Sequence, residues 1–183
     1  MIFEEYLSLF DEILNHTELH PQYQDPNYYE YAKMNASRTR RWLKKFVPTV
    51  ELKNKIDGIS EKQTWILITE PWCGDAAHSV PQIYELVKSN PNIALDIQLR
   101  DSEPYLIDKY LTNGGKSIPI LVIRDAEGND LGVWGPRPSK LQELFLEMKA
   151  EGLDMNEIKE FIQKWYNDDK GVELQNDLLK ILA

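Results

Sequence analysis

The sequence has little cysteine and no long apolar run. Cys73 is the only cysteine among 183 residues, so the chain cannot form an internal disulfide, which fits a reducing compartment. No apolar stretch approaches the roughly 20 residues needed to cross a bilayer. The start of the chain carries Glu4 and Glu5, where a secretory signal would carry positive charge. We therefore expect a cytoplasmic protein that has no membrane partner.

Positive charge is also in short supply. The chain has 21 Lys and Arg against 30 Asp and Glu, a net charge of −9, which argues against nucleic acid as a partner because phosphate binding needs a cationic surface. One local exception is the basic run between Lys33 and Lys45, which contains Arg38, Arg40, Arg41 and Lys44. Such a run is typical of a solvated helix face. It would equally suit docking of an acidic partner or of a small thiol that bears a carboxylate.

Metal ligands are scarce. The three histidines, His16, His20 and His78, are scattered, and with a single cysteine they match no structural zinc pattern. The sequence has no Gly-rich phosphate loop and no Ser–His–Asp order. We expect no metal site and no bound cofactor, apart from an external low-molecular-weight thiol as a co-substrate.

What the chain does have is the composition of an ordinary globular protein, with 42% apolar and 28% charged residues. Its secondary-structure patterns divide it into three regions. Residues 1–58 have the apolar spacing of helices, and Asp25 followed by Pro26 predicts the start of a helix that ends before Pro48. Residues 59–150 alternate between strand and helix patterns. Residues 151–183 are helical again, and Asp154 is the expected N-cap. We expect both helical extensions to pack on the central region as one globular unit.

The central region predicts an α/β fold with a mixed sheet flanked by helices. Expected strands cover 65–69, 93–99, 118–123 and 131–134, the last two forming a hairpin; expected helices cover 75–88, 102–111 and 140–150. Ser139 and Gln142 have the spacing of a capping box ahead of the last helix.

The most informative segment is Pro71-Trp72-Cys73-Gly74-Asp75, which places the cysteine at a strand-to-helix turn. A cysteine at a helix start faces unpaired backbone N–H groups and the positive end of the helix dipole. Both favour the thiolate, which is the nucleophilic form. The sequence therefore predicts a reactive Cys73 with a low pKa.

With these elements in order, the central region resembles the thioredoxin superfamily. That family has Trp-Cys-Gly-Pro-Cys at a helix start, and here the segment reads Trp72-Cys73-Gly74-Asp75-Ala76. A helix-kinking proline lies eight residues after the first cysteine in thioredoxins, as Pro81 does after Cys73. The remaining matches are the Ile118-Pro119 pair and Gly135 beyond the hairpin.

The resemblance implies a thioredoxin-like fold over residues 59–150, with a cis peptide bond at Pro119. It also implies a catalytic Cys73 and substrate binding by five neighbours: Trp72, Gly74, Ile118, Pro119 and Gly135.

Two departures limit what the resemblance implies for function. Ala76 stands where the family has its second, resolving cysteine, so an external thiol such as glutathione, or a partner protein, would have to release the substrate. Leu67 stands where many thioredoxins bury a carboxylate that moves protons. General dithiol reductase activity is therefore not expected.

Two residues near Cys73 are candidate modulators. Asp75 stabilises the first helical turn, but its charge would raise the pKa of the thiol. His78 would assist Cys73 as a cation or proton carrier, or else be an exposed helix residue. Glu70 would approach the sulfur only if the strand end turned it that way.

Two functions remain open on the sequence. The first is monothiol thiol–disulfide exchange, acting on protein disulfides or thiol-capped proteins through Cys73. The second is a non-catalytic thioredoxin-fold module that binds protein partners, since a fold does not fix a function.

Overall fold

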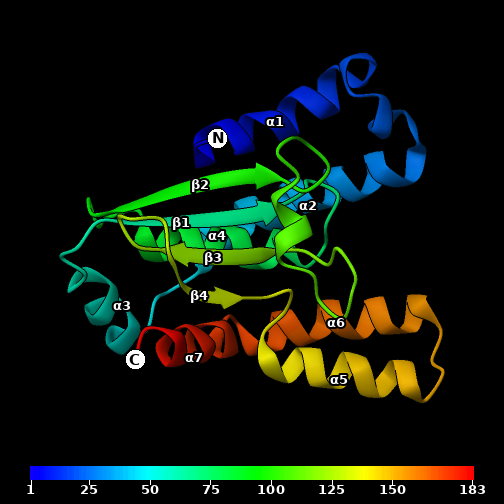
Figure 1. Cartoon of the computed structure of the whole chain (residues 1–183). Coiled ribbons are helices and arrows are strands. Elements are labelled where there is room, and N and C mark those ends of the chain that lie inside the picture. The colour runs from blue at the N-terminus through cyan, green and yellow to red at the C-terminus, as the bar shows by residue number, and fades with distance from the viewer.

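A computed structural model describes all residues, 1–183, and contains one four-stranded sheet with helices around it (Figure 1). The strands are β1 (Gln63–Thr69), β2 (Ile93–Leu99), β3 (Ile120–Arg124) and β4 (Asp130–Trp134). Their order across the sheet is β2-β1-β3-β4. β1 pairs in parallel with β2 and antiparallel with β3, and β3 pairs antiparallel with β4. The predicted mixed sheet and hairpin are confirmed.

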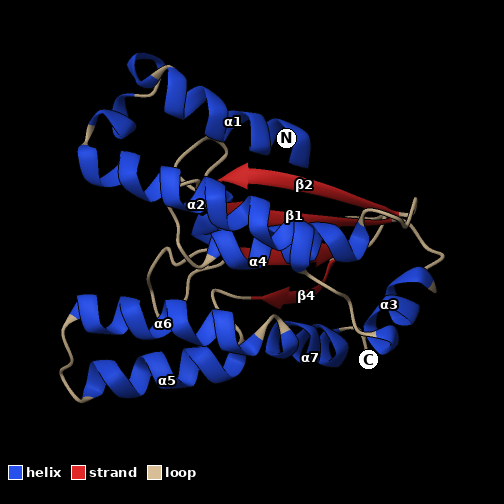
Figure 2. Ribbon diagram, turned by 180° about the vertical axis from the view of Figure 1, so that it is seen from behind, coloured by secondary structure: helices blue, strands red, loops and turns tan.

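The helices are α1 (Phe3–Asn15), α2 (Pro26–Lys45), α3 (Val50–Asp57), α4 (Ala76–Val87), α5 (Ser139–Ala150), α6 (Met155–Asp169) and α7 (Val172–Ile181). Seen from behind, α2 and α4 lie together against one face of the sheet (Figure 2). α1 runs along the β2 edge, while α5, α6 and α7 gather beyond the β4 edge (Figures 1 and 2). None of these helices combines the length and the apolar composition that a membrane-spanning segment requires.

β1 is the centre of the core. Its residues from Trp65 to Ile68 are all buried, because strands lie on both sides of it and helices cover it. A continuous apolar run is what such a strand requires. The sheet thereby fixes the point at which β1 ends and the segment carrying Cys73 begins.

α2 begins and ends as the sequence predicts. The Asp25 carboxylate accepts a hydrogen bond from the Asn27 N–H at 2.8 Å, and Pro26 is the first helical residue. One face of α2 is buried against α4, through small residues and Trp42. The N-terminal region is therefore part of the structure that surrounds the cysteine.

The helix expected over 102–111 is wrong. Only Leu106–Lys109 forms a single 3-10 turn. Tyr105, directly before it, has a left-handed backbone with φ 53°, so a helix cannot run through that residue.

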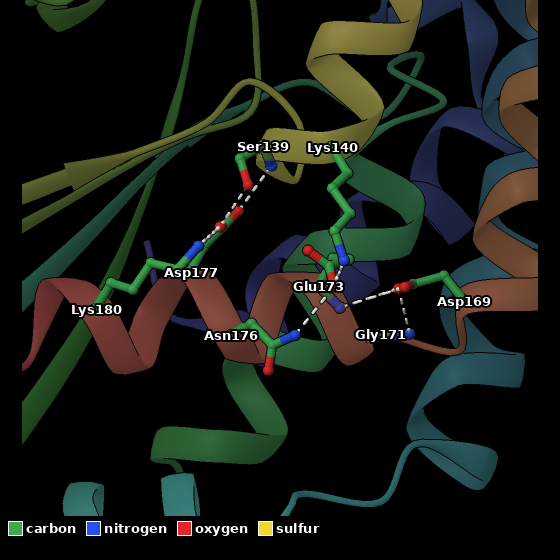
Figure 3. Close-up of polar contacts among 8 residues, drawn as sticks. All are labelled: Ser139, Lys140, Asp169, Gly171, Glu173, Asn176, Asp177 and Lys180. Carbon is green, nitrogen blue, oxygen red and sulfur yellow. Dashed lines mark hydrogen bonds and ion pairs between the residues drawn. The ribbon is translucent and has the colours of Figure 1, made fainter.

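The expected capping box at Ser139 is also wrong. Ser139 is itself helical, and its N–H and hydroxyl both donate to the Asp177 carboxylate of α7, at 2.8 and 2.7 Å (Figure 3). Gln142 instead accepts from Arg137 at 3.1 Å. The first N–H group of α5 therefore has its acceptor in a residue 38 positions away, which no local sequence pattern predicts.

The N-cap predicted at Asp154 is confirmed, because its carboxylate accepts from the Asn156 N–H at 2.8 Å at the start of α6.

The last two helices, α6 and α7, are joined through a tightly packed glycine. Gly171, between α6 and α7, has φ +84° and lies so close to Gln82 of α4 that an added Cβ would be 2.4 Å from its Oε1. The C-terminal region thus packs directly on the helix that follows Cys73.

Candidate functional site

Cys73 lies between the end of β1 and the start of α4. Its N–H donates to the Glu70 carbonyl at 3.0 Å, and its thiol donates to the Ile118 carbonyl at 3.4 Å. The Ile118–Pro119 peptide bond is cis, as predicted. The residue is only 7% exposed, so the sulfur is a hydrogen-bonded thiol with a small opening to its surroundings.

The predicted low pKa of Cys73 is wrong for this structure. Burial, and to a smaller extent the nearby Asp75 carboxylate, raise the pKa of the thiol to about 12. The backbone N–H of Ala76 and the Arg137 guanidinium lower the pKa, but less than burial raises it. The helix start does favour the thiolate of Cys73, but desolvation of the sulfur raises its pKa by more than the helix start lowers it.

A cavity of about 870 Å³ opens beside Cys73. It is lined by residues from α2, from the Cys73 segment, from the stretch before β3, and from α5 and α6. Its apolar wall consists of Tyr28, Tyr31, Met34, Trp72, Ile118, Phe145, Met155 and Ile162. Its volume falls in the range of ligand sites of proteins.

The aromatic wall is braced by neighbouring side chains. The ring of Tyr28 meets Trp72 edge-on at 5.7 Å, and the Arg100 guanidinium lies 4.6 Å from the centre of the Trp72 ring. On the other side, the Arg137 guanidinium lies 4.1 Å from the Phe145 ring. These contacts hold flat apolar surfaces and positive charges side by side at the cavity.

Asp75 is held by a positive partner and a hydroxyl. Its carboxylate pairs with Arg137 at 2.8 Å and accepts from the Tyr166 hydroxyl at 3.0 Å. The Asp75 side chain is 11% exposed and that of Arg137 is 15% exposed. Burial raises the pKa of Asp75, while Arg137 and Tyr166 oppose the rise. The interpretation of Asp75 as a residue that raises the Cys73 pKa agrees with this geometry.

His78 is neither an exposed residue nor a cation, contrary to both interpretations of the sequence. It is completely buried, its Nδ1 accepts from the Trp42 indole at 2.8 Å, and its Nε2 lies 2.9 Å from the Gln163 amide oxygen. This pattern places the proton on Nε2, and burial lowers the pKa of the ring to about 3. With its ring stacked 4.2 Å from Tyr166, His78 is a neutral link between α2, α4 and α6.

The basic run of α2 divides into separate roles. Arg40 pairs with Asp11 of α1, and Arg41 donates to Asn167 at 2.7 Å. Only Arg38 of the run lines the cavity, where its guanidinium donates to the Asn35 amide oxygen at 2.9 Å. The sequence indicated a basic helix but not which residue faces Cys73.

The other predicted site residues are split between the cavity and its surroundings. Trp72, Gly74, Asp75 and Ile118 line the cavity together with Cys73, whereas Pro119 and Gly135 do not. Gly135 has φ +119° and packs so closely that an added Cβ would lie 2.2 Å from the Pro119 carbonyl oxygen. Both therefore shape the backbone behind the cavity.

Glu70 does not line the cavity. Its carboxylate accepts from the Asp101 N–H at 3.0 Å, and burial raises its pKa to about 7. No group of three or more His, Cys, Asp or Glu side chains is arranged so as to hold a metal ion. The cavity therefore offers one thiol, five cationic side chains and the carboxylates of Asp75 and Glu160.

Sequence reasoning missed much of the cavity. Arg100, Arg137, Phe145 and Gln163 come from loops or helices far from Cys73 in the chain, and no motif marks them. The only available signal was the basic run that contains Arg38.

Comparison with known proteins agrees with the fold. A family model described as Thioredoxin matches residues 22–151, reaching back to include α2. A comparison with curated proteins finds no match for the chain.

Two solved structures are similar over most of their length. One is an HIV epitope scaffold, with TM-score 0.58, 19% identity, and 82% of this chain and 84% of that chain covered. The other is a protein of unknown function from Pseudomonas aeruginosa, with TM-score 0.57, 19% identity and 84% of each chain covered. At this identity they show a common fold and nothing more.

Proposed function

The chain belongs to the thioredoxin family, and from that premise we propose that it carries out thiol–disulfide exchange through its single cysteine. The observation that carries the proposal is that Cys73 lies in the wall of the 870 Å³ cavity, together with Trp72, Gly74 and Ile118. A substrate seated there would place a sulfur next to the only thiol of the protein.

The exchange takes two steps. The Cys73 thiolate attacks the small-thiol sulfur of a mixed disulfide that joins a small thiol to a cysteine of the substrate protein. The old S–S bond breaks, Cys73 becomes disulfide-bonded to the small thiol, and the substrate protein leaves as a thiolate, which takes up a proton. An external thiol then loses its proton and attacks that mixed disulfide, which frees Cys73 and releases a small disulfide. The external thiol is oxidised and the capped protein is reduced, so no other redox partner is needed. A cytoplasm supplies such thiols.

The resting protein keeps this chemistry slow. With the Cys73 pKa raised to about 12, nearly every molecule carries the thiol at neutral pH. The thiolate fraction then rises tenfold with each pH unit. We therefore expect the rate of mixed-disulfide formation to climb from pH 7 to pH 10 without a plateau.

Mass spectrometry of the intact chain tests this first prediction. The wild-type chain, mixed with a small disulfide, should gain one adduct whose formation rate follows this pH dependence. Cys73→Ser is the matched control and should gain none. An adduct on Cys73→Ser, or none on the wild type even at pH 10, would refute the exchange.

A binding module is the second candidate, and the raised pKa of Cys73 favours it. A protein that only binds partners needs the cavity and no thiolate. In that case a captured partner should be retained equally by the wild type and Cys73→Ser, with no adduct on either. Loss of the partner on Cys73→Ser would exclude this candidate.

A further inference from the structure

We propose that Arg38 is the residue that selects the substrate, and that the small thiol transferred to Cys73 carries an anionic group, in its simplest form a carboxylate. The inference rests on the proposed exchange and adds to it the class of the small thiol. The anionic group would pair with the Arg38 guanidinium while the sulfur reaches Cys73.

The first step concerns which charges at the cavity are free. Five cationic side chains line it, and three of them have carboxylate partners: Arg100 with Asp101, Lys116 with Asp108, and Arg137 with Asp75. Lys159 donates to the Tyr31 hydroxyl at the exposed rim. Arg38 makes its contact with the neutral Asn35 amide and has no carboxylate within ion-pair distance. It is the half-buried cation that remains available.

The second step concerns position. A Cβ added to Gly74 would lie 4.0 Å from a terminal nitrogen of Arg38 and 3.6 Å from the Gln163 amide nitrogen. The free guanidinium therefore lies above the residue next to Cys73. A ligand whose anionic group is a few bonds from its sulfur can contact both.

The third step concerns the electrostatic setting. The cavity has five cations against two carboxylates, Asp75 and Glu160, on a chain whose net charge is −9. Within the cavity, the Arg137 Nε is buried and has no hydrogen-bond partner. Positive charge is concentrated here against the trend of the whole molecule, which favours an anion.

The fourth step concerns energy. Burial and the neighbouring Arg41 lower the pKa of Arg38, so its charge is held at a cost. A buried charge is stabilised by a partner of opposite sign. The guanidinium fork can donate two hydrogen bonds to one carboxylate, and the aromatic wall can cover the rest of the ligand.

Three small disulfides of similar size test the inference. Dithiodipropionate carries two carboxylates, bis-hydroxyethyl disulfide is neutral, and cystamine carries two ammonium groups. The rate of adduct formation on Cys73 is measured at pH 8.5 for each. Each rate is then divided by the rate of the same disulfide with the urea-unfolded chain, which removes differences in intrinsic reactivity.

The wild type should favour dithiodipropionate over the neutral disulfide by about tenfold, and cystamine should be slowest. Arg38→Gln should remove this preference, while Arg38→Lys should keep part of it. Arg40→Gln, on the same helix but outside the cavity, should keep all of it. Added salt should weaken the wild-type preference, which tests the charge even if Arg38→Gln does not fold.

The outcomes separate the inference from the proposed function. Equal normalised rates for all three disulfides on the wild type would overturn the role of Arg38 and leave the exchange standing. If none reacts, the exchange fails, and calorimetry of dithiodipropionate with Cys73→Ser then tests the anion site alone. Binding that is lost in the Cys73→Ser, Arg38→Gln double variant supports the site, and no binding to Cys73→Ser overturns it.

Discussion

At the scale of single residues, the protonation state of Cys73 is a balance of opposed effects. The N–H of Ala76 and the Arg137 guanidinium favour the thiolate, while burial and Asp75 favour the thiol. Desolvation is the largest of these effects, so the resting sulfur is protonated. Asp75 is the part of this balance that an isosteric substitution, Asp75→Asn, changes directly.

Asp75→Asn should make Cys73 more reactive. Removing the carboxylate takes away a charge that raises the pKa of the thiol, and it leaves Arg137 unpaired nearby. A pKa lower by about one unit gives about a tenfold faster reaction with iodoacetamide at pH 8.

The control is Asp168→Asn, on the exposed side of α6, where the Asp168 carboxylate pairs only with Lys164. It should leave the rate unchanged. An Asp75→Asn rate equal to or below the wild type would mean that Asp75 does not restrain the thiol.

At the scale of elements, packing of the C-terminal helices on α4 depends on the backbone between α6 and α7. Gly171 has φ +84° and lies against Gln82 and Phe46, with 2.4 Å and 2.9 Å between an added Cβ and their nearest atoms. Neither the φ angle nor the space admits a larger side chain.

Gly171→Ala should therefore destabilise the protein by about 2–4 kcal/mol, combining the left-handed backbone cost with overpacking. Gly152→Ala is the matched control, because Gly152 also has positive φ, +78°, but an added Cβ there has nothing within 4 Å. It should cost only about 1 kcal/mol. Urea unfolding of both variants measures the difference, and equal losses would show that the contact with α4 is unimportant.

At the scale of the whole molecule, two buried groups make stability depend on pH in opposite directions. The pKa of His78 is about 3 in the folded state, below its ordinary value, so its contribution is lost as pH falls below about 6.5. The pKa of Glu70 is about 7, above its ordinary value of 4.5, so its contribution is lost as pH rises from 4.5 through 7. The folded state is favoured most between these limits.

Glu70→Gln should remove the loss of stability that Glu70 causes as the pH rises from 4.5 through 7. The variant should be more stable than the wild type by about 2 kcal/mol at pH 8 and about equal to it at pH 4.5. The amide oxygen can still accept from the Asp101 N–H, and the contribution of His78 is common to both chains.

Urea unfolding at the two pH values measures this difference. Glu127→Gln, in the exposed hairpin turn, is the control and should match the wild type at both. A Glu70→Gln variant that is less stable at pH 8 would contradict the assignment.

Interactions between residues that are close in the sequence determined many of the secondary-structure elements of this protein. The apolar run of β1, the Asp25-Pro26 start of α2 and the Asp154 cap of α6 all follow from short patterns, whereas the cis bond at Ile118-Pro119 was implied by the family resemblance. Each of these patterns depends on neighbours within a few positions, so the sequence alone suffices. The mixed sheet and the placement of Cys73 at a helix start follow from the same patterns.

Only the tertiary structure decided how charged the sulfur is and what surrounds it. The depth of burial that keeps Cys73 protonated, the Asp177 cap on α5 and the neutral His78 all depend on residues dozens of positions away. Desolvation and long-range hydrogen bonds have no signature in a local pattern. For the same reason, the basic run is visible in the sequence, but which of its residues faces the cavity is not. Arg38 faces the cavity because of the way α2 packs on α4.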